Sequence, residues 1–269
     1  GNGFSGKIED TEVNIGDQSC LVLNVTLDQI KCQTEGGEGA QDLTVTSGNT
    51  EFPKDLFRYE ESSTPKILSL APENGETPIS LHVKGQNFGT KPEVTMGIYT
   101  CTVTESTSDT IKCDVGAIPG GNVPVRIRAE EYGYSNNMVF KAELLLTKVQ
   151  PTSGSMGGGT LLTLTGKAFD PEMENVQVLI CGAPSKIIKS SHNEITLQTP
   201  LNNGTGQVSC NVELKQKYKG NTLLENGYQY DDALTPKLTS VSPKRGGTGG
   251  GTPITLTGSG FATSGNKVL

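Results

Sequence analysis

The sequence has no tryptophan, only two histidines, and no run of apolar residues long enough to cross a bilayer as a helix. Such a crossing takes about 20 consecutive, predominantly apolar residues. The first residues also lack the basic and then apolar pattern of a signal peptide. We therefore expect no direct membrane insertion of this segment. The chain begins at Gly1 without Met, so we interpret it as a piece of a longer protein.

Positive charge is scarce, because 22 lysines and arginines face 29 acidic residues and the net charge is -7. Proteins that bind nucleic acid need a basic surface that displaces the counterions of the phosphate backbone. The charge balance therefore predicts no nucleic-acid partner. Glycine is abundant instead, with 34 residues that punctuate short runs of Val, Ile, Leu and Thr. That composition is typical of a turn-rich β protein.

Patterns that carry catalysis or bind metals are missing as well. There is no G-x-S-x-G, H-E-x-x-H, Walker or C-x-x-C sequence. His82 and His192 fall in different parts of the chain, and we interpret both as surface or structurally satisfied residues. The sequence therefore predicts no enzyme activity, no metal site and no cofactor.

The opening "GNGFSG" fits the G-x-G-x-x-G pattern of a dinucleotide-binding loop, but repeats change its meaning. It returns as "GQNF", "GKAF" and "GSGF", which share the first Gly and the Phe but lose glycines that a phosphate would need. A phosphate-binding loop must also open a helix, whereas "KIEDTEVNIG" follows here and predicts a strand. We expect the first Gly to turn the chain with a positive φ. The phenylalanines are expected to fill cores: Phe4, Phe88, Phe169 and Phe261.

The repeats define domains. A proline, a glycine-rich turn and an alternating strand precede the last three Gly-x-x-Phe copies, as in "SVSPKRGGTGGGTPITLTG". Each unit of about 80 residues contains short alternating strands without helical periodicity, which is the pattern of a two-sheet sandwich. We place units at 1–61, 65–142 and 145–231, and the start of another at 236–269. The first lacks its opening strands, and the last contains only such strands.

Taken together, these motifs resemble IPT/TIG domains, the Ig-like folds shared by plexins, transcription factors and giant surface proteins. The motifs are Pro-x-x-Gly, Gly-Gly-Gly-Thr, Leu-Thr-Leu-Thr-Gly, Gly-x-x-Phe and the "IG...C...IKCQT" run, and they cover essentially the whole chain. "GNGFSG" and "CGAPSKIIKSSHNEITLQTP" are most similar to tandem repeats of the fibrocystin family, particularly its fibrocystin-like branch.

The resemblance implies an all-β, elongated array of Ig-like sandwiches of the E-set type. It also implies a place in the ectodomain of a large, receptor-like, single-pass membrane protein. By family resemblance, that ectodomain lies on the extracellular side of the plasma membrane, on cilia- or stereocilia-like projections.

The six cysteines fall two to a unit, as intradomain disulfides do in an oxidising compartment. Two units repeat a spacing of twelve residues, so we expect their pairs to link neighbouring strands. The third has Leu197 in place of the second cysteine, and its other cysteine lies at the place of Val125. Our hypothesis is a different pairing there. The expected disulfides are Cys20 with Cys32, Cys101 with Cys113, and Cys181 with Cys210.

Two glycosylation sequons agree with an extracellular location. Asn24-Val25-Thr26 and Asn203-Gly204-Thr205 both fit N-x-[ST]. Sugar is therefore expected on Asn24 and Asn203.

Small acidic clusters raise the alternative of calcium binding, since calcium takes six to eight oxygen ligands. No spaced D-x-D-x-D-G loop accompanies them, and we interpret them as solvated faces. The clusters comprise Glu9, Asp10 and Glu12; Glu60 and Glu61; Glu130 and Glu131; Asp170, Glu172 and Glu174; Asp231 and Asp232.

The sequence raises three candidate functions. The first is a structural and adhesive ectodomain segment, a semi-rigid spacer that contacts other cell-surface or matrix proteins or associates with itself. The second is a ligand-binding receptor module of the plexin-stalk type, with Tyr132 and Tyr134 as the candidate interaction patch. The third, DNA binding, conflicts with the charge. We also expect that the strands at 236–269 could complete the first domain of another copy, unless both ends are arbitrary cuts.

Overall fold

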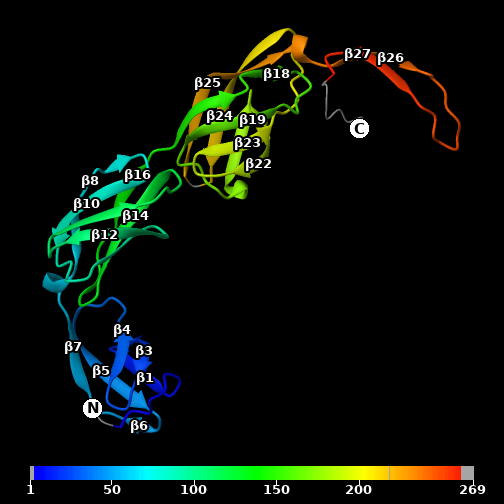
Figure 1. Cartoon of the computed structure of the whole chain (residues 1–269). Helices are drawn as coiled ribbons and strands as arrows, with labels where there is room; N and C mark the ends of the chain where they lie inside the picture. The colour runs from blue at the N-terminus through cyan, green and yellow to red at the C-terminus, as the bar shows by residue number, and fades with distance from the viewer. Residues whose placement is uncertain (1–2, 218, 262–269) are drawn as a thin grey trace. The chain divides into compact units, whose positions relative to one another are not determined.

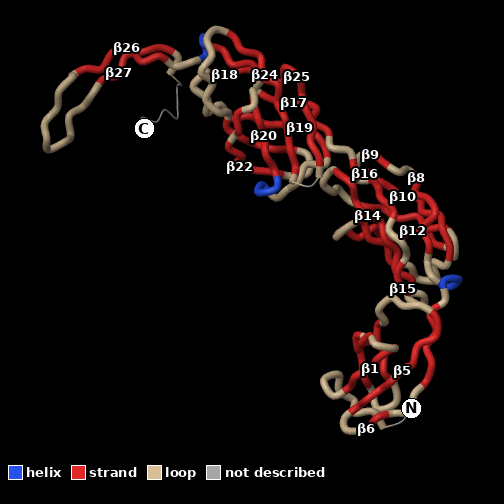
Figure 2. Tube along the Cα trace, turned by 180° about the vertical axis from the view of Figure 1, so that it is seen from behind, coloured by secondary structure: helices blue, strands red, loops and turns tan. Residues whose placement is uncertain are grey.

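The structure is a computed structural model that describes residues 3–217 and 219–261. Strands make up nearly all of its regular structure (Figure 2). Within the described residues the only helices are three short 3-10 turns: η1 (Glu61–Ser63), η2 (Met173–Asn175) and η3 (Asp232–Leu234). None of them approaches the length and apolar character of a membrane-spanning helix. The chain separates into two units, Gly1–Thr64 and Pro65–Leu269.

The first domain is the unit Gly1–Thr64, drawn in blue in Figure 1. One sheet has the order β2-β1-β5-β6, with β7 also on β5, and β3 pairs with β4 as a separate ribbon. Its buried apolar core is small and consists of Val13, Ile15 and Cys20, with partly buried side chains around them. The strands are β1 (Thr11–Ile15), β2 (Gln18–Ser19), β3 (Leu21–Val25), β4 (Ile30–Gln33), β5 (Gly39–Ser47), β6 (Thr50–Glu51) and β7 (Asp55–Tyr59).

The second domain is a complete two-layer sandwich. Strands β8-β10-β13-β12 form one layer, and β11, β14, β15, β16 and β9 form the other. β12 pairs with β13 along one part and with β11 along another, so it links the two layers. The strands are β8 (Lys66–Ala71), β9 (Asn74–Gly75), β10 (Ile79–Gln86), β11 (Glu93–Met96), β12 (Tyr99–Ser106), β13 (Thr110–Val115), β14 (Gly121–Ala129), β15 (Gly133–Tyr134) and β16 (Met138–Ala142).

The third domain repeats this arrangement, with layers β17-β19-β23-β22 and β18-β25-β24-β20-β21. Its strands alternate buried and exposed residues because each layer faces the other on one side and water on the opposite side. The strands are β17 (Leu145–Gln150), β18 (Ser153–Ser155), β19 (Leu161–Lys167), β20 (Val176–Ile180), β21 (Ala183–Pro184), β22 (Lys186–Ser190), β23 (Glu194–Gln198), β24 (Gln207–Gln216) and β25 (Gly220–Asp231). A hairpin of β26 (Lys237–Ser242) and β27 (Thr255–Ser259) follows.

The Gly-x-x-Phe motif is a packing device, but the expected role of its first glycine was wrong. The positive φ falls on the third residue, which is Asn87 at 58° and Ala168 at 60°. Gly85 and Gly166 have no positive φ; instead, an added methyl group at either would overlap a strand carbonyl oxygen and the ring of the motif's own Phe. Glycine is needed there because backbone and ring approach too closely for a side chain.

The expectation for the four phenylalanines holds in the two complete sandwiches only. Phe88 and Phe169 are fully buried, so their predicted core role is confirmed. Phe4 is half-buried and contacts Phe52, with ring centroids 4.8 Å apart. Phe261 is 45% exposed, which contradicts the expectation. The reason is that the hairpin β26–β27 has no second sheet packed on it among the described residues.

Candidate functional site

Each of the three domains contains one disulfide. Cys20–Cys32 and Cys101–Cys113 have Cα atoms 5.7 and 5.4 Å apart, and Cys181–Cys210 has them 4.8 Å apart. The Cys101–Cys113 bond lies fully buried where β12 passes between the layers. There it ties β12, which links the two layers, to the neighbouring strand β13.

The third domain places its first cysteine at a different point of the same hairpin. Gly97 opens the two-residue turn between β11 and β12 with a φ of 60°, and Cys181 opens the turn between β20 and β21 with a φ of 50°. Gly182 then follows with a φ of 77°. Two successive positive φ angles are typical of a type I′ turn, whereas one at the first position is typical of type II′. Cys181 therefore occupies the left-handed position that glycine fills in the second domain.

The structure also shows which residue of the third domain lies where the first two domains have their first cysteine. The backbone N–H of Cys20 donates to the Val13 carbonyl at 2.7 Å, and that of Ser185 donates to the Val178 carbonyl at 2.8 Å. Ser185 is thus the counterpart of Cys20, and its hydroxyl is buried without a hydrogen-bond partner in the described structure. Leu197 is completely buried at the place of the second cysteine. The third domain thus has a serine and a leucine where the first two domains have a disulfide, and its own disulfide lies nearby.

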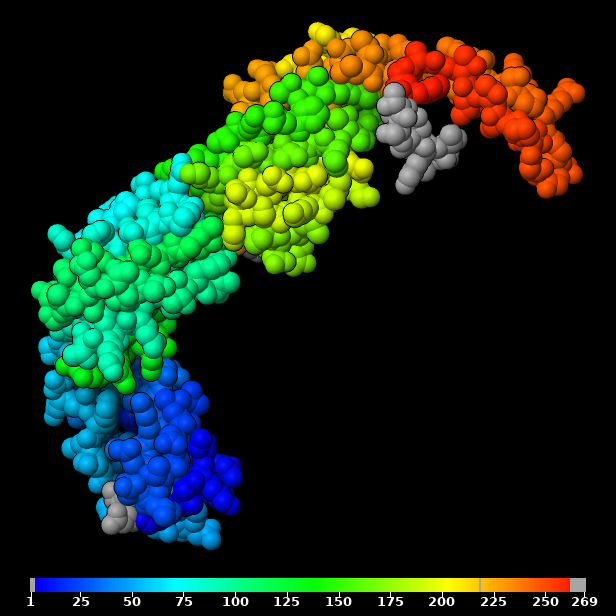
Figure 3. Space-filling model, in the orientation of Figure 1, coloured from blue at the N-terminus to red at the C-terminus, as the bar shows by residue number. Residues whose placement is uncertain are grey.

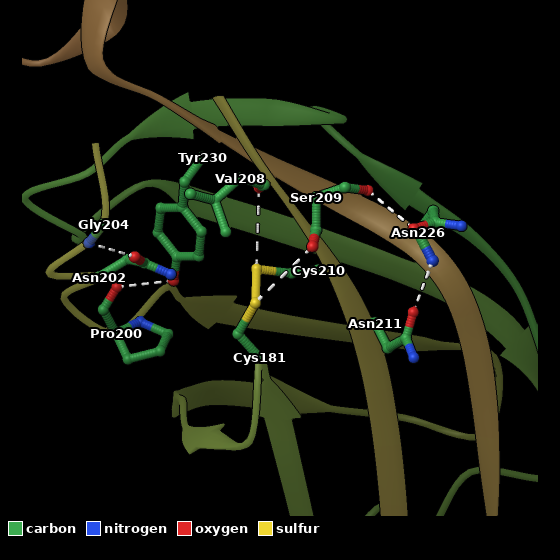
Figure 4. Close-up of a disulfide and its surroundings, with 10 residues drawn as sticks. All are labelled: Cys181, Pro200, Asn202, Gly204, Val208, Ser209, Cys210, Asn211, Asn226 and Tyr230. Carbon is green, nitrogen blue, oxygen red and sulfur yellow. Dashed lines mark hydrogen bonds between the residues drawn. A yellow bond between two sulfur atoms is a disulfide. The ribbon is translucent and has the colours of Figure 1, made fainter. Parts of the chain in front are cut away.

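Figure 4 shows the surroundings of Cys181–Cys210. Cys210 is buried on β24, whereas Cys181 is exposed at the hairpin turn. On the outer face beside it, Ser209 Oγ donates to Asn226 Oδ1 at 2.9 Å, and the Asn226 N–H donates to Asn211 Oδ1 at 2.9 Å. Ser209 and Asn211, together with Cys181, border a shallow hollow of about 380 Å³. It has no aromatic side chain and no ionisable group other than Glu213 in its lining.

Both sequons lie at the surface. Asn24 is exposed on β3, and Asn203 is exposed in the loop before β24. In that loop Asn202 Oδ1 accepts the Gly204 N–H at 2.8 Å, which fixes the turn around Asn203 (Figure 4). Both asparagines are therefore accessible to a bulky sugar.

The candidate interaction patch gains a residue that the sequence reading missed. The Arg126 guanidinium lies 3.9 Å from the centre of the Tyr134 ring. Tyr132 and Tyr134 are 46% and 42% exposed. On the same strand, Arg128 forms an ion pair of 3.2 Å with Glu93. The alternation in "VRIR" signals that both arginines share the outer face of β14, and they are two of only four arginines in the chain.

One acidic residue is not part of a solvated face, contrary to expectation. The Asp170 side chain is 3% exposed and pairs with Lys219 Nζ at 2.9 Å. It also accepts the Glu172 N–H at 3.0 Å and Asn175 Nδ2 at 3.3 Å. A buried carboxylate is tolerated when a cation and hydrogen bonds offset its lost hydration. Lys219, far away in sequence, is the partner that the sequence reading missed.

No catalytic or metal-binding group assembles in the described residues. His82 is exposed on β10, and His192 Nδ1 lies 3.2 Å from the Phe169 carbonyl oxygen. No cluster of three or more His, Cys, Asp or Glu suited to a metal occurs in residues 3–217 and 219–261. Figure 3 shows the surface of the second and third domains from one side, coloured from cyan through green and yellow to orange.

Comparison with known proteins gives a consistent picture. The IPT/TIG domain model matches residues 1–59, 65–142, 144–230 and 236–269. The chain is 33% identical to human (Homo sapiens) Fibrocystin-L over 97% of its length and to the Mus musculus protein to the same extent. It is 24% identical to Canis lupus familiaris Fibrocystin over 71% of its length. The chain spans about 6% of the length of the Fibrocystin-L relatives. The predicted resemblance is confirmed.

Comparison with solved structures finds partial similarities. The plexin A4 full extracellular region shares 16% identity, with a TM-score of 0.35, 92% of this chain covered and 28% of that chain. The Yersinia pseudotuberculosis adhesin InvE shares 14% identity, with a TM-score of 0.35, 62% of this chain covered and 58% of that chain.

Proposed function

The chain belongs to the IPT/TIG domain family, and on that premise we propose that it is a non-enzymatic extracellular segment of a large receptor-like cell-surface protein. The observation that carries the proposal is that each of the three domains has its own core and its own disulfide. Persistent disulfides are typical of an oxidising compartment. We propose the domain limits given above, 1–61, 65–142, 145–231 and 236–269.

Within this protein the segment acts as a semi-rigid spacer and an adhesive surface. Support comes from the short connection between the second and third domains, where only residues 143–144 separate β16 from β17. In the same unit, the Gly120 N–H donates to the Ala168 carbonyl at 2.7 Å, and Lys167 forms an ion pair with Glu76. Because only two residues of connecting chain separate the two sandwiches, there is room for only limited bending between them.

The partners that we propose are other cell-surface or matrix proteins, including further copies of the chain. The location that we propose is the extracellular side of the plasma membrane, on cilia- or stereocilia-like projections. The three disulfides and the 33% identity to the relatives named Fibrocystin-L support the extracellular part of this proposal.

The experiment that tests this function is peptide mapping without reductant, with and without glycosidase, on protein secreted from animal cells. We expect three intradomain disulfides and sugar on Asn24 or Asn203. Free thiols together with bare asparagines would contradict an extracellular role.

A second candidate function is a ligand-binding receptor module, favoured by the stacked pair of Arg126 and Tyr134. Arginine and tyrosine are enriched among residues that dominate protein interfaces. If this face binds a ligand, Tyr134→Ala and Arg126→Ala should each weaken binding of the labelled segment to cell surfaces. Tyr99→Phe, in the same domain, is the matched control, and equal binding by all variants would exclude this face.

A further inference from the structure

We propose that a sugar on Asn24 protects the exposed edge strand β3 of the first domain, doing there what charged side chains do in the other two domains. This inference rests on the proposed extracellular function. It assigns the sugar a place and a physical role that the sequon alone does not specify.

The argument begins with a β-bulge that recurs in the chain. In the first domain Val22 pairs with Cys32 and Asn24 with Lys31, so Leu23 is the extra residue. In the second domain Val103 pairs with Cys113 and the register shifts in the same way. A bulge places two neighbouring side chains on one side of the strand. Leu23 and Asn24 are accordingly both exposed, whereas Val25 is buried.

The outer side of β3 is unusually apolar. Leu21 is 62% exposed and Leu23 is 42% exposed. The shared bulge register aligns these two residues with Thr102 and Thr104 of the second domain. The strand "LVLNV" also has no charged residue. The first domain therefore presents leucine where the second domain presents hydroxyl groups.

β3 is also an edge. It has a hydrogen-bonded neighbour only on its β4 side among the described residues (Figure 1). Exposed apolar edge strands pair with other chains and aggregate unless charge, proline, a bulge or a cover prevents it. The bulge is present in this strand in all three domains, so the domains differ in the charge of the strand and not in the bulge.

The equivalent strands carry charge at the position of Asn24. The counterpart on β12 is Glu105, opposite Lys112, and the counterpart on β22 is Lys189, opposite Thr196. Only the first domain has a neutral residue there, and that residue is the acceptor of a sequon. A glycan is bulky and solubilising, and attached beside Leu23 it would cover the leucines and block the free edge.

The glycan is the occupant that the structure favours because its attachment point lies within the apolar surface itself. The Asn24 side chain makes no hydrogen bond to another described residue and points to solvent. The second sequon, at Asn203, lies in a loop and not on a strand edge. It therefore serves as an internal control.

The test uses the whole segment secreted from animal cells. Mapping first establishes which asparagines carry sugar; light scattering after gel filtration and binding of a hydrophobic dye then compare the variants. We expect Asn24→Gln to associate as its concentration rises and to bind more dye, while Asn203→Gln stays monomeric. Asn24→Gln combined with Leu21→Thr and Leu23→Thr should be monomeric again. Asn24→Glu, which copies the second domain, should also be monomeric.

The outcomes separate this inference from the proposed function. A bare Asn24 overturns the inference and leaves the extracellular role standing as long as the disulfides form, whereas two bare asparagines together with free thiols overturn both. A monomeric Asn24→Gln variant overturns the shielding role. Association that the threonine substitutions do not relieve overturns it too, since the sugar would then act in folding and not as a cover.

Discussion

At the scale of single residues, the Gly-x-x-Phe motif separates two demands that glycine can meet. Gly166 meets the demand for space, because a methyl group would strike the Leu145 carbonyl oxygen and the Phe169 ring. Ala168 lies where the backbone must be left-handed, and it adopts that conformation with a φ of 60°. Gly260, at the same place in the last copy, has a φ of 74°.

These two requirements predict that two small substitutions will differ in their effect on the stability of the third domain. Gly166→Ala should destabilise the third domain by about 1–3 kcal/mol, as overpacking of a filled core does. Ala168→Gly should change its stability by less than about 1 kcal/mol, because relief at positive φ is offset by the greater freedom of glycine in the unfolded chain. Denaturant unfolding measures both. A Gly166→Ala variant as stable as the parent would refute the steric explanation.

Tyr230 gives the third domain a dependence on alkaline pH. Its hydroxyl donates to the Pro200 carbonyl at 2.7 Å. Burial, aided by the neighbouring Tyr228, raises its pKa from 10.0 to about 12. The folded state therefore keeps a proton that the unfolded state releases above pH 10.

The stability that Tyr230 contributes should be complete below pH 10 and should be lost as pH rises from 10 through about 12. Tyrosinate absorbance should show that Tyr230 ionises at a higher pH than an exposed tyrosine. The melting temperature of this domain should fall over the same pH range. Tyr230→Phe should flatten this part of the pH profile. If the profile stays equally steep in that variant, another group is responsible.

At the scale of elements, the hairpins that open with Gly97 and Cys181 show that a disulfide can move within a conserved frame. In the second domain this frame is the pair of layers joined at β12. In the third domain it is the pair of layers joined where β21 leads into β22. Ser185 and Leu197 lie at the positions of that frame where the first two domains have their cysteines.

The disulfide of the first two domains should therefore be transferable to the third domain. In a variant with Cys181→Gly and Cys210→Val, the added pair Ser185→Cys and Leu197→Cys should bond spontaneously. The closed loop would have twelve residues, as in the second domain, against 29 at present. The shorter loop should stabilise by ~1 kcal/mol less on the chain-entropy model. Peptide mapping checks the bond, and persistent free thiols would show that the layers meet differently there.

At the scale of the whole molecule, the domains differ in how much core each possesses. Among the described residues, sixteen buried side chains form the core of the second domain and sixteen that of the third, but only three form that of the first. Burial of apolar surface is the main favourable contribution to folding. The first domain therefore depends most on its disulfide, which the loop-entropy model values at about 3 kcal/mol.

Calorimetry of this chain should show the first domain unfolding at the lowest temperature. Mild reduction should remove that transition first, since Cys32 is only partly buried, whereas Cys101 and Cys113 are fully buried. Cys20→Ala with Cys32→Ala should reproduce the effect without reductant, and the other transitions should keep their temperatures. A single transition for all domains would contradict independent cores.

The sequence by itself determined the repeat, the fold class and the family, because these depend on local patterns: turn glycines, alternating strands and recurrent motifs. It also indicated the cysteine pairs and the surface position of the sequons. Such features need only the residues near each position and comparison among copies.

Only the tertiary structure decided what depends on residues distant in the chain. The sequence predicts a solvated Asp170, but the structure buries it beside Lys219. Likewise, the guanidinium of Arg126 lies against the Tyr134 ring, a contact that the sequence does not predict. The reason for Gly166 is a carbonyl oxygen on a neighbouring strand, and the exposure of Phe261 follows from the lack of an opposing sheet among the described residues. Close approach and burial are properties of packed layers, and no local pattern encodes them.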